Sequence, residues 1–224
     1  DIAILELVQP LGFSSKLHPI PIMQAQANLT FPEGVQLRAV GWGQTEQSRM
    51  SRTLMVTELR QPDLEYCAKG LPELLGPDES VRMEWLCAAS PKPEAGGHDT
   101  CFGDSGGALI ALPMEGTEGT TGGPRPILAG LTSFGINVHA LSSTKCAAPG
   151  SVGIYSQVGL WVPWISSITG IPEARLFQGD WEESQGYGGP VSAASRSMEG
   201  VVWMAEGGLM TGLIGAAIVF IVFM

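Results

Sequence analysis

The sequence is poor in basic residues, with 12 Lys and Arg against 22 Asp and Glu and a formal net charge of −10. Proteins that bind nucleic acids need clustered Lys and Arg to contact phosphates, and no such cluster occurs here. We therefore expect no nucleic-acid partner. No pattern of metal ligands and no cofactor motif is present either, so neither a metal nor a cofactor is predicted.

Histidine and cysteine are also scarce. The three histidines, His18, His98 and His139, all fall in predicted loops, where ordinary solvated side chains are the expected interpretation. The four cysteines are Cys67, Cys87, Cys101 and Cys146. Four cysteines allow three pairings, and the sequence alone does not choose among them. Four reduced thiols in a cytosolic protein are the alternative.

Long apolar runs are rare before the C-terminus, and the chain instead carries short ones separated by Gly, Pro, Ser and Thr. This pattern is typical of an all-β barrel or sandwich. The short runs lie at residues 35–40, 108–112, 127–132 and 153–158. Residues 157–169 are the exception, because their apolar spacing predicts a helix.

The most informative motif is Cys-Phe-Gly-Asp-Ser-Gly-Gly at residues 101–107. It places a serine hydroxyl in a glycine-rich turn, where backbone N–H groups can face a reacting carbonyl. Ser105 is the candidate nucleophile, and the N–H groups of Gly103 and Ser105 are the candidate oxyanion hole. The alternative is an ordinary surface turn, since Gly, Asp and Ser are common turn residues.

This motif resembles the nucleophile motif of the trypsin/chymotrypsin family of serine proteases. Further segments resemble that family in the same order and extend the similarity over about residues 1–170. They are Asp-Ile-Ala-Ile-Leu-Glu-Leu at 1–7, Gly-Trp-Gly at 41–43, Thr-Ser-Phe-Gly at 132–135, Gly-Ile-Tyr at 153–155 and Trp-Val-Pro-Trp-Ile at 161–165. The resemblance implies two six-stranded antiparallel barrels, of which residues 1–29 hold the end of the first and the following residues nearly all of the second.

The resemblance also implies a Ser-His-Asp triad, in which histidine shuttles a proton and a buried aspartate orients the histidine. Asp1 matches the aspartate. In the family's chain order the histidine comes before it, so we expect an N-terminally truncated serine endopeptidase that is inactive by itself. His98 is expected near the site without being the base. The alternative is a non-catalytic homologue that serves as a binding or regulatory module.

The implied substrates are proteins or peptides with Arg or Lys before the cut. Asp99 aligns with the base of the family's primary pocket, and Gly135 and Gly153 align with its walls. Ser133, Phe134 and Gly135 are expected to pair with the substrate backbone as an added strand. Phe134 replaces the family's usual tryptophan. A solvated aspartate in the loop at residues 96–100 is the alternative interpretation of Asp99.

The family's disulfide pattern implies the bonds Cys67–Cys87 and Cys101–Cys146. It also implies a zymogen, in which an activating protease creates a new amino terminus that pairs with Asp104 and shapes the oxyanion hole. Asn28 begins an Asn-Leu-Thr glycosylation acceptor sequence. These features favour a secretory route.

The C-terminal part changes in composition. Residues 171–206, rich in Gly, Ser and acidic residues, are expected to form a flexible stalk. Residues 207–224 are uncharged, and as a helix they would reach about 27 Å, which suits a membrane anchor. A buried soluble helix, a transmembrane helix and a cleaved lipid-anchor signal stay open, the last with Ser192-Ala193-Ala194 as attachment point. The expected location is extracellular and attached to the cell surface.

Overall fold

The computed structural model describes residues 2–7, 17, 19–26, 29–32, 34–69, 71, 84–112, 125–139, 145–178 and 221–223. Three residues discussed above, Asp1, His18 and Asn28, lie outside these ranges. So do most of the expected stalk and most of the apolar tail. The predictions for these residues therefore remain predictions.

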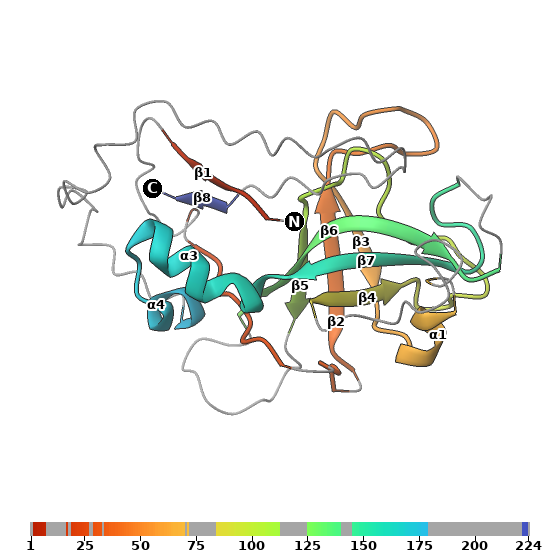
Figure 1. The fold of residues 1–224 in the computed structure, drawn as a ribbon. Coiled ribbons are helices and arrows are strands. Elements are labelled where there is room, and N and C mark those ends of the chain that lie inside the picture. The colour runs from red at the N-terminus through yellow and green to blue at the C-terminus, as the bar shows by residue number, and fades with distance from the viewer. Residues whose placement is uncertain are drawn as a thin grey trace, which may run out of the picture.

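The main feature is a curled antiparallel sheet of six strands in the order β3-β2-β5-β6-β7-β4 (Figure 1). Two edge strands, β3 and β4, are joined by a bridge in which Arg60 and Ala89 exchange two backbone hydrogen bonds of 2.9 Å. The sheet thereby closes on itself, which confirms the all-β, trypsin-like fold expected from the sequence. The strands are β2 (Gln36–Gly41), β3 (Met55–Leu59), β4 (Trp85–Ala89), β5 (Ala108–Leu112), β6 (Ile127–Asn137) and β7 (Ser151–Gln157).

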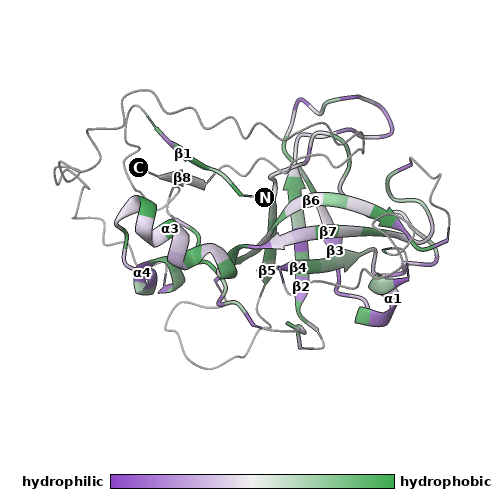
Figure 2. Ribbon diagram, viewed as in Figure 1, coloured by the Kyte–Doolittle hydropathy of each residue, from purple (hydrophilic) through white to green (hydrophobic). Residues whose placement is uncertain are grey.

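The interior of the sheet explains why these segments form strands. In β5 buried and half-buried residues alternate, and β7 is buried along its whole length. Figure 2 shows hydrophobic residues gathered in the strands and hydrophilic ones mostly in the loops. Tyr155, Leu37 and Leu109 are fully buried in one core cluster. Burying this apolar surface stabilises the barrel.

Helices cover the two ends of the sheet (Figure 1). At one end lies α1 (Leu64–Ala68), and at the other lie η1 (Val158–Trp161), α3 (Val162–Thr169) and α4 (Glu173–Gln178). Pro163 stands in the first turn of α3, and Gly170 ends it in the left-handed conformation at φ 72°. Both are the residues expected there. The helix predicted at residues 157–169 is therefore present as η1 and α3.

The boundary of the expected stalk differs from the prediction. Residues 171–178 belong to the folded part, because α4 follows α3 and packs against it. Ile171 and Leu176 are 6 % exposed and lie in the same core cluster as Ile165. Ile171 and Leu176 stand among polar residues, so the sequence pattern does not indicate a helix here.

A second, two-stranded sheet pairs β1 (Ile4–Glu6) in parallel with β8 (Ile221–Phe223). The described end of the apolar tail is thus a short strand, next to the N-terminal segment. Among the residues that the structure describes, no helix has the length and apolar character required to span a membrane.

Candidate active site

The loop that carries the serine motif is held by its own backbone and by Asp104. Its carboxylate Oδ2 accepts a hydrogen bond of 2.8 Å from the Cys101 N–H, while the Asp104 N–H donates to the Cys101 carbonyl at 3.0 Å. Gly103 and Gly106 have φ of 94° and 80°. Side chains rarely tolerate such angles, so the motif needs glycine at both positions.

The same loop is fixed to strand β6. The Gly106 N–H donates to the Thr132 carbonyl at 2.8 Å, and the Thr132 N–H donates to the Gly107 carbonyl at 2.9 Å. Ser105 directly precedes the two anchored glycines and is exposed. Within the described residues its hydroxyl makes no hydrogen bond. A serine presented in this way is open to a substrate.

The predicted oxyanion-hole donors are also open. No backbone acceptor among the described residues takes the N–H of Gly103 or of Ser105. The Phe102 carbonyl accepts a hydrogen bond of 2.8 Å from the Gln44 N–H. Because the carbonyl and N–H of one peptide unit point in opposite directions, this bond fixes where the Gly103 N–H points.

The Gly41-Trp42-Gly43 turn forms a cradle for Asp104, a contact that the sequence alone did not reveal. The Gly43 N–H donates to Asp104 Oδ1 at 2.7 Å. A Cβ added at Gly41 or Gly43 would overlap the Asp104 carboxylate. Glycine is therefore required at both positions, because a larger residue would displace the Asp104 carboxylate.

We predict that Gly41→Ala lowers the free energy of unfolding by about 2 to 3 kcal/mol, because the new methyl group occupies the place of Asp104 Oδ1. Urea denaturation measures this change. The control is Gly135→Ala, whose Cβ would meet no atom closer than the Val152 carbonyl oxygen at 3.8 Å. Equal midpoints for the two variants would contradict the cradle.

Asp99, predicted at the base of the primary pocket, stands two residues before Cys101 and is half-buried. Its Oδ1 accepts a hydrogen bond of 2.8 Å from the Thr100 N–H, and its Oδ2 accepts one of 3.2 Å from the Ala147 N–H. Burial raises the pKa of Asp99 to about 6, although both hydrogen bonds act in the opposite direction. A carboxylate that is costly to ionise favours a cationic partner.

The two glycines predicted to form the pocket walls lie side by side on neighbouring strands. Gly135 in β6 is paired directly with Gly153 in β7. A Cβ at Gly153 would overlap the ring of Tyr155, whose hydroxyl lies 3.2 Å from Thr100 Oγ1. Ser133 and Phe134 precede Gly135 on the same strand. The residues predicted to form the pocket thus come from adjacent strands and from the loop of Asp99.

The structure contains one of the two disulfides that the resemblance implies. Cys101 and Cys146 are bonded, with Cα atoms 5.5 Å apart, and this bond joins the serine loop to the residues after β6. The bond predicted between Cys67 and Cys87 is not formed, because both are free, buried thiols. The neighbouring Cys87 thiol, together with burial, raises the pKa of Cys67 far above its ordinary value.

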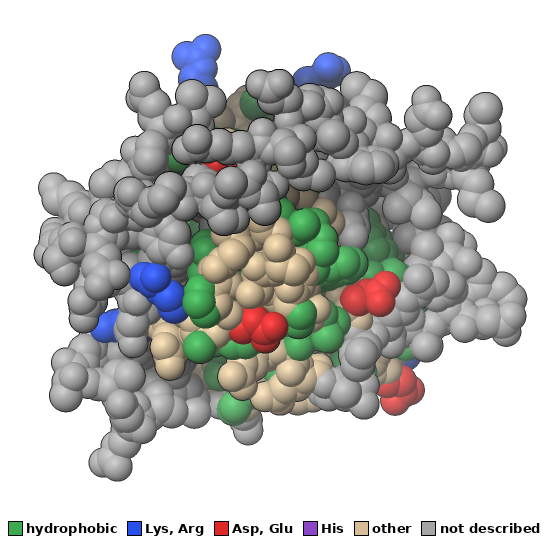
Figure 3. Space-filling model, turned by 60° about the vertical axis from the view of Figure 1, so that its left-hand side comes forward, with side chains coloured by type: hydrophobic (Ala, Val, Ile, Leu, Met, Phe, Trp, Pro, Cys, Tyr) green, Lys and Arg blue, Asp and Glu red, His purple; other side chains and the backbone are tan. Residues whose placement is uncertain are grey.

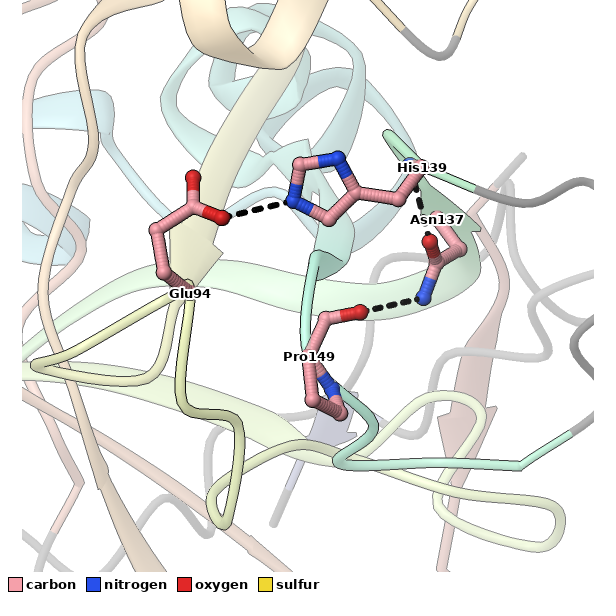
Figure 4. A network of polar contacts seen from close by, with 4 residues as sticks. All are labelled: Glu94, Asn137, His139 and Pro149. Carbon is pink, nitrogen blue, oxygen red and sulfur yellow. Dashed lines mark hydrogen bonds and ion pairs between the residues drawn. The ribbon is translucent and has the colours of Figure 1, made fainter.

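Neither described histidine contacts Ser105. His98 is exposed, and its Nδ1 lies 3.3 Å from the Thr57 hydroxyl. His139 Nε2 lies 2.7 Å from Glu94 Oε2 (Figure 4). No local pattern indicates Glu94 as the partner of His139, because the two are 45 residues apart in the sequence.

A cavity of about 650 Å³ lies beside His98 and Asp99. Asp99, Cys101 and Asp104 line one side, and Gly41 and Gly43 line another. The other lining residues are Ala39, Val40, Gln44, Thr45, Glu46, Met55, Val56, Thr57, Gly97, His98, Thr100, Lys145, Cys146 and Ala147. The cavity therefore reaches the carboxylates of both Asp99 and Asp104.

On the face drawn in Figure 3, hydrophobic side chains lie beside single acidic ones, and the visible Lys and Arg side chains lie towards its upper and left margins. This distribution agrees with the acidic composition.

Comparison with known proteins extends the similarity over most of the chain. A sequence model of the trypsin family matches residues 1–165. Tryptase of Mus musculus is 33% identical over 174 residues, which are 74% of this chain and 54% of the tryptase. The clotting factor G beta subunit of Tachypleus tridentatus is 29% identical over 183 residues, 80% of this chain and 53% of the subunit.

The serine protease filzig of Drosophila melanogaster is 30% identical over 172 residues, which are 76% of this chain and 9% of filzig. The chain thus spans about half the length of the tryptase and the clotting factor subunit and a small part of filzig. With a matched family model over residues 1–165 and a closed antiparallel sheet, the chain belongs to the trypsin family.

Proposed function

We propose that the protein is a serine endopeptidase that cleaves after Arg or Lys. The observation that carries this proposal is the exposed Ser105 beside the open N–H groups of Gly103 and Ser105. Ser105 Oγ attacks the scissile carbonyl carbon, and its proton passes to a histidine base. The two N–H groups stabilise the oxyanion. The leaving amine takes the proton, and water then hydrolyses the acyl ester.

The base is a histidine oriented by Asp1. His98 and His139 are not assigned this role, because their rings contact Thr57 and Glu94 instead of Ser105. The acyl-transfer step therefore requires a histidine that the family places before Asp1 in the chain.

The specificity rests on Asp99, whose carboxylate pairs with the guanidinium or ammonium of the substrate side chain. Gly135 leaves room for that long side chain, because a Cβ there would meet no atom closer than 3.8 Å, whereas Gly153 leaves room for the Tyr155 ring behind the pocket wall. Ser133, Phe134 and Gly135 hold the substrate backbone as an extra strand beside β6. Protein and peptide chains are the substrates.

Activation proceeds by cleavage from a zymogen. The new amino terminus enters the cavity beside Asp104 and pairs with its carboxylate, so an activating protease is a partner. The protein is extracellular and glycosylated at Asn28, and residues 207–224 attach it to the cell surface.

The test uses the protein expressed from its complete coding sequence, activated by limited proteolysis. We expect a fluorophosphonate probe to label the protein at Ser105 and not the Ser105→Ala variant. We also expect hydrolysis of peptides that end in Arg or Lys, and at least 100-fold slower hydrolysis of Ala-ended peptides, since Asp99 has no cation to pair with. Labelling of both forms alike would refute the assignment of Ser105, and equal hydrolysis of the peptides would refute the pocket.

The second candidate function is that of a non-catalytic binding or regulatory module. It is compatible with the contacts of His98 and His139, whose rings lie against Thr57 and Glu94 and not against Ser105. The coding sequence upstream of Asp1 discriminates between the two. A histidine in an Ala-Ala-His-Cys-like context supports the enzyme, whereas a different residue there supports the module.

A further inference from the structure

His139 joins two loops that lead to Asp99. It stands two residues after the end of β6, and its ring reaches Glu94 in the segment before Asp99 (Figure 4). The distance from Nε2 to Glu94 Oε2 is 2.7 Å, and the two side chains are 49% and 68% exposed. The bond is therefore an ion pair when the imidazole is protonated, and it is accessible to changes in pH.

Hydrogen bonds and packing fix the position of His139. Its backbone N–H donates to Asn137 Oδ1 at 2.9 Å, and Asn137 Nδ2 donates to the Pro149 carbonyl at 2.9 Å (Figure 4). The ring lies so close to Gly150 that a Cβ there would overlap it, and Gly150 has φ of 82°. The turn at residues 145–150 is thus built around this imidazole.

Residues 91–97 and 145–150 are also joined by backbone hydrogen bonds close to Asp99. The Gly150 N–H donates to the Pro93 carbonyl at 2.9 Å, and the Gly97 N–H donates to the Ala147 carbonyl at 2.8 Å. Next to these, the Ala147 N–H donates a hydrogen bond of 3.2 Å to Asp99 Oδ2. A shift of residues 145–150 away from residues 91–97 would therefore move a donor away from the Asp99 carboxylate.

The charged groups around the pair come from α1 and from the Glu94 loop. Tyr66 and Lys69 face Glu94 from the α1 side, with the Lys69 ammonium 5.8 Å from the centre of the Tyr66 ring. The Tyr66 hydroxyl is buried without a hydrogen bond of good geometry, and burial, then Glu94, raises the pKa of Tyr66 to about 12. The hydrogen bond from His139 and the nearby Lys69 lower the pKa of Glu94, which favours its ionised form.

We propose that His139 is a positioning residue for the cation pocket: its ion pair with Glu94 holds residues 145–150 against residues 91–97 and so holds the Ala147 N–H on Asp99. The inference rests on the proposed function of Asp99. Affinity for a cation therefore falls when the charge at residue 139 is removed, and on the acid side it falls as Asp99 gains a proton.

The test measures binding of p-aminobenzamidine, an arginine-like cation, at pH 6.5 to the activated protein expressed from its complete coding sequence. We expect His139→Gln and Glu94→Gln to bind about two- to fivefold more weakly than the unaltered protein, the range that exposed ion pairs support. His139→Arg keeps a charge at this position and binds as tightly as the unaltered protein. Glu58→Gln, which breaks the exposed Arg38–Glu58 pair at 3.3 Å, is the control and does not change the affinity.

Hydrogen exchange of the Gly97, Ala147 and Gly150 amides, corrected for intrinsic pH dependence, is measured on the same variants. Protection should follow the charge of residue 139 in the same two- to fivefold range. The same binding and exchange profiles in the unaltered chain and in His139→Gln would overturn the inference. Absence of any p-aminobenzamidine binding, in the unaltered chain and in Asp99→Ala alike, would refute the pocket, while the exchange data would still decide whether His139 holds the loop.

Discussion

Replacing Asp99 by alanine should weaken binding of p-aminobenzamidine at pH 7.5 by about 30-fold or more. Removal of one partner from a buried, hydrogen-bonded charge pair costs about 2 to 5 kcal/mol. Asp99 is half-buried, and the acceptors of the Thr100 and Ala147 N–H groups disappear with it. Fluorescence titration of the chain measures the loss.

The direction in which affinity changes with pH below 6 follows from the pKa of Asp99. Burial raises the pKa of Asp99 to about 6, so the carboxylate is charged above this pH and protonated below it. Affinity for the cation should therefore fall about tenfold for each pH unit below 6. Neutral p-aminobenzamide is the matched ligand, and its affinity should not change with pH or with Asp99→Ala. A cation affinity that is flat down to pH 4.5 would contradict the role of Asp99.

Removing the Cys101–Cys146 disulfide should lower the free energy of unfolding by about 4 kcal/mol, because the bond closes a loop with a sequence separation of 45. The double variant Cys101→Ser/Cys146→Ser, unfolded in urea, measures the loss. The bond also joins the serine loop to the turn that carries Ala147, so the variant should bind p-aminobenzamidine more weakly as well.

The control for this prediction comes from the other two cysteines. Cys67 and Cys87 are free, so a reducing agent should not destabilise the double variant further. Under denaturing conditions the unaltered chain should show two reactive thiols. A further loss of stability on reduction would mean that Cys67 and Cys87 are bonded in solution.

The strands with clear apolar runs could be predicted from the sequence, and those without them could not. The runs at residues 108–112 and 153–158 correspond to β5 and to most of β7. In contrast, β3 exposes most of its side chains because it lies at the edge of the sheet. Its sequence, Met-Val-Thr-Glu-Leu, has no strict alternation, so only its pairing with β2 identifies it.

At the site, motifs predicted the residues but not their contacts. The serine motif and Asp99 were found because local spacing fixes their alignment. The Gly41–Asp104 cradle and the Glu94–His139 pair join residues that are far apart in the sequence, so no local pattern indicates them. The pairing of Cys67 with Cys87 was predicted from the family alone, and the structure brings the two thiols together without a bond.

The strand order has a consequence for synthesis on the ribosome. β4 precedes β5 and β6 in the chain, yet it pairs along its whole length with β7, which is made last of the six. Trp85 must wait for Ser156, its partner in the register, 71 residues later. Until then β4 is an exposed apolar edge, and contacts of such long separation form slowly. A nascent chain halted before residue 151 would therefore be a target for chaperones, whatever the stability of the finished protein.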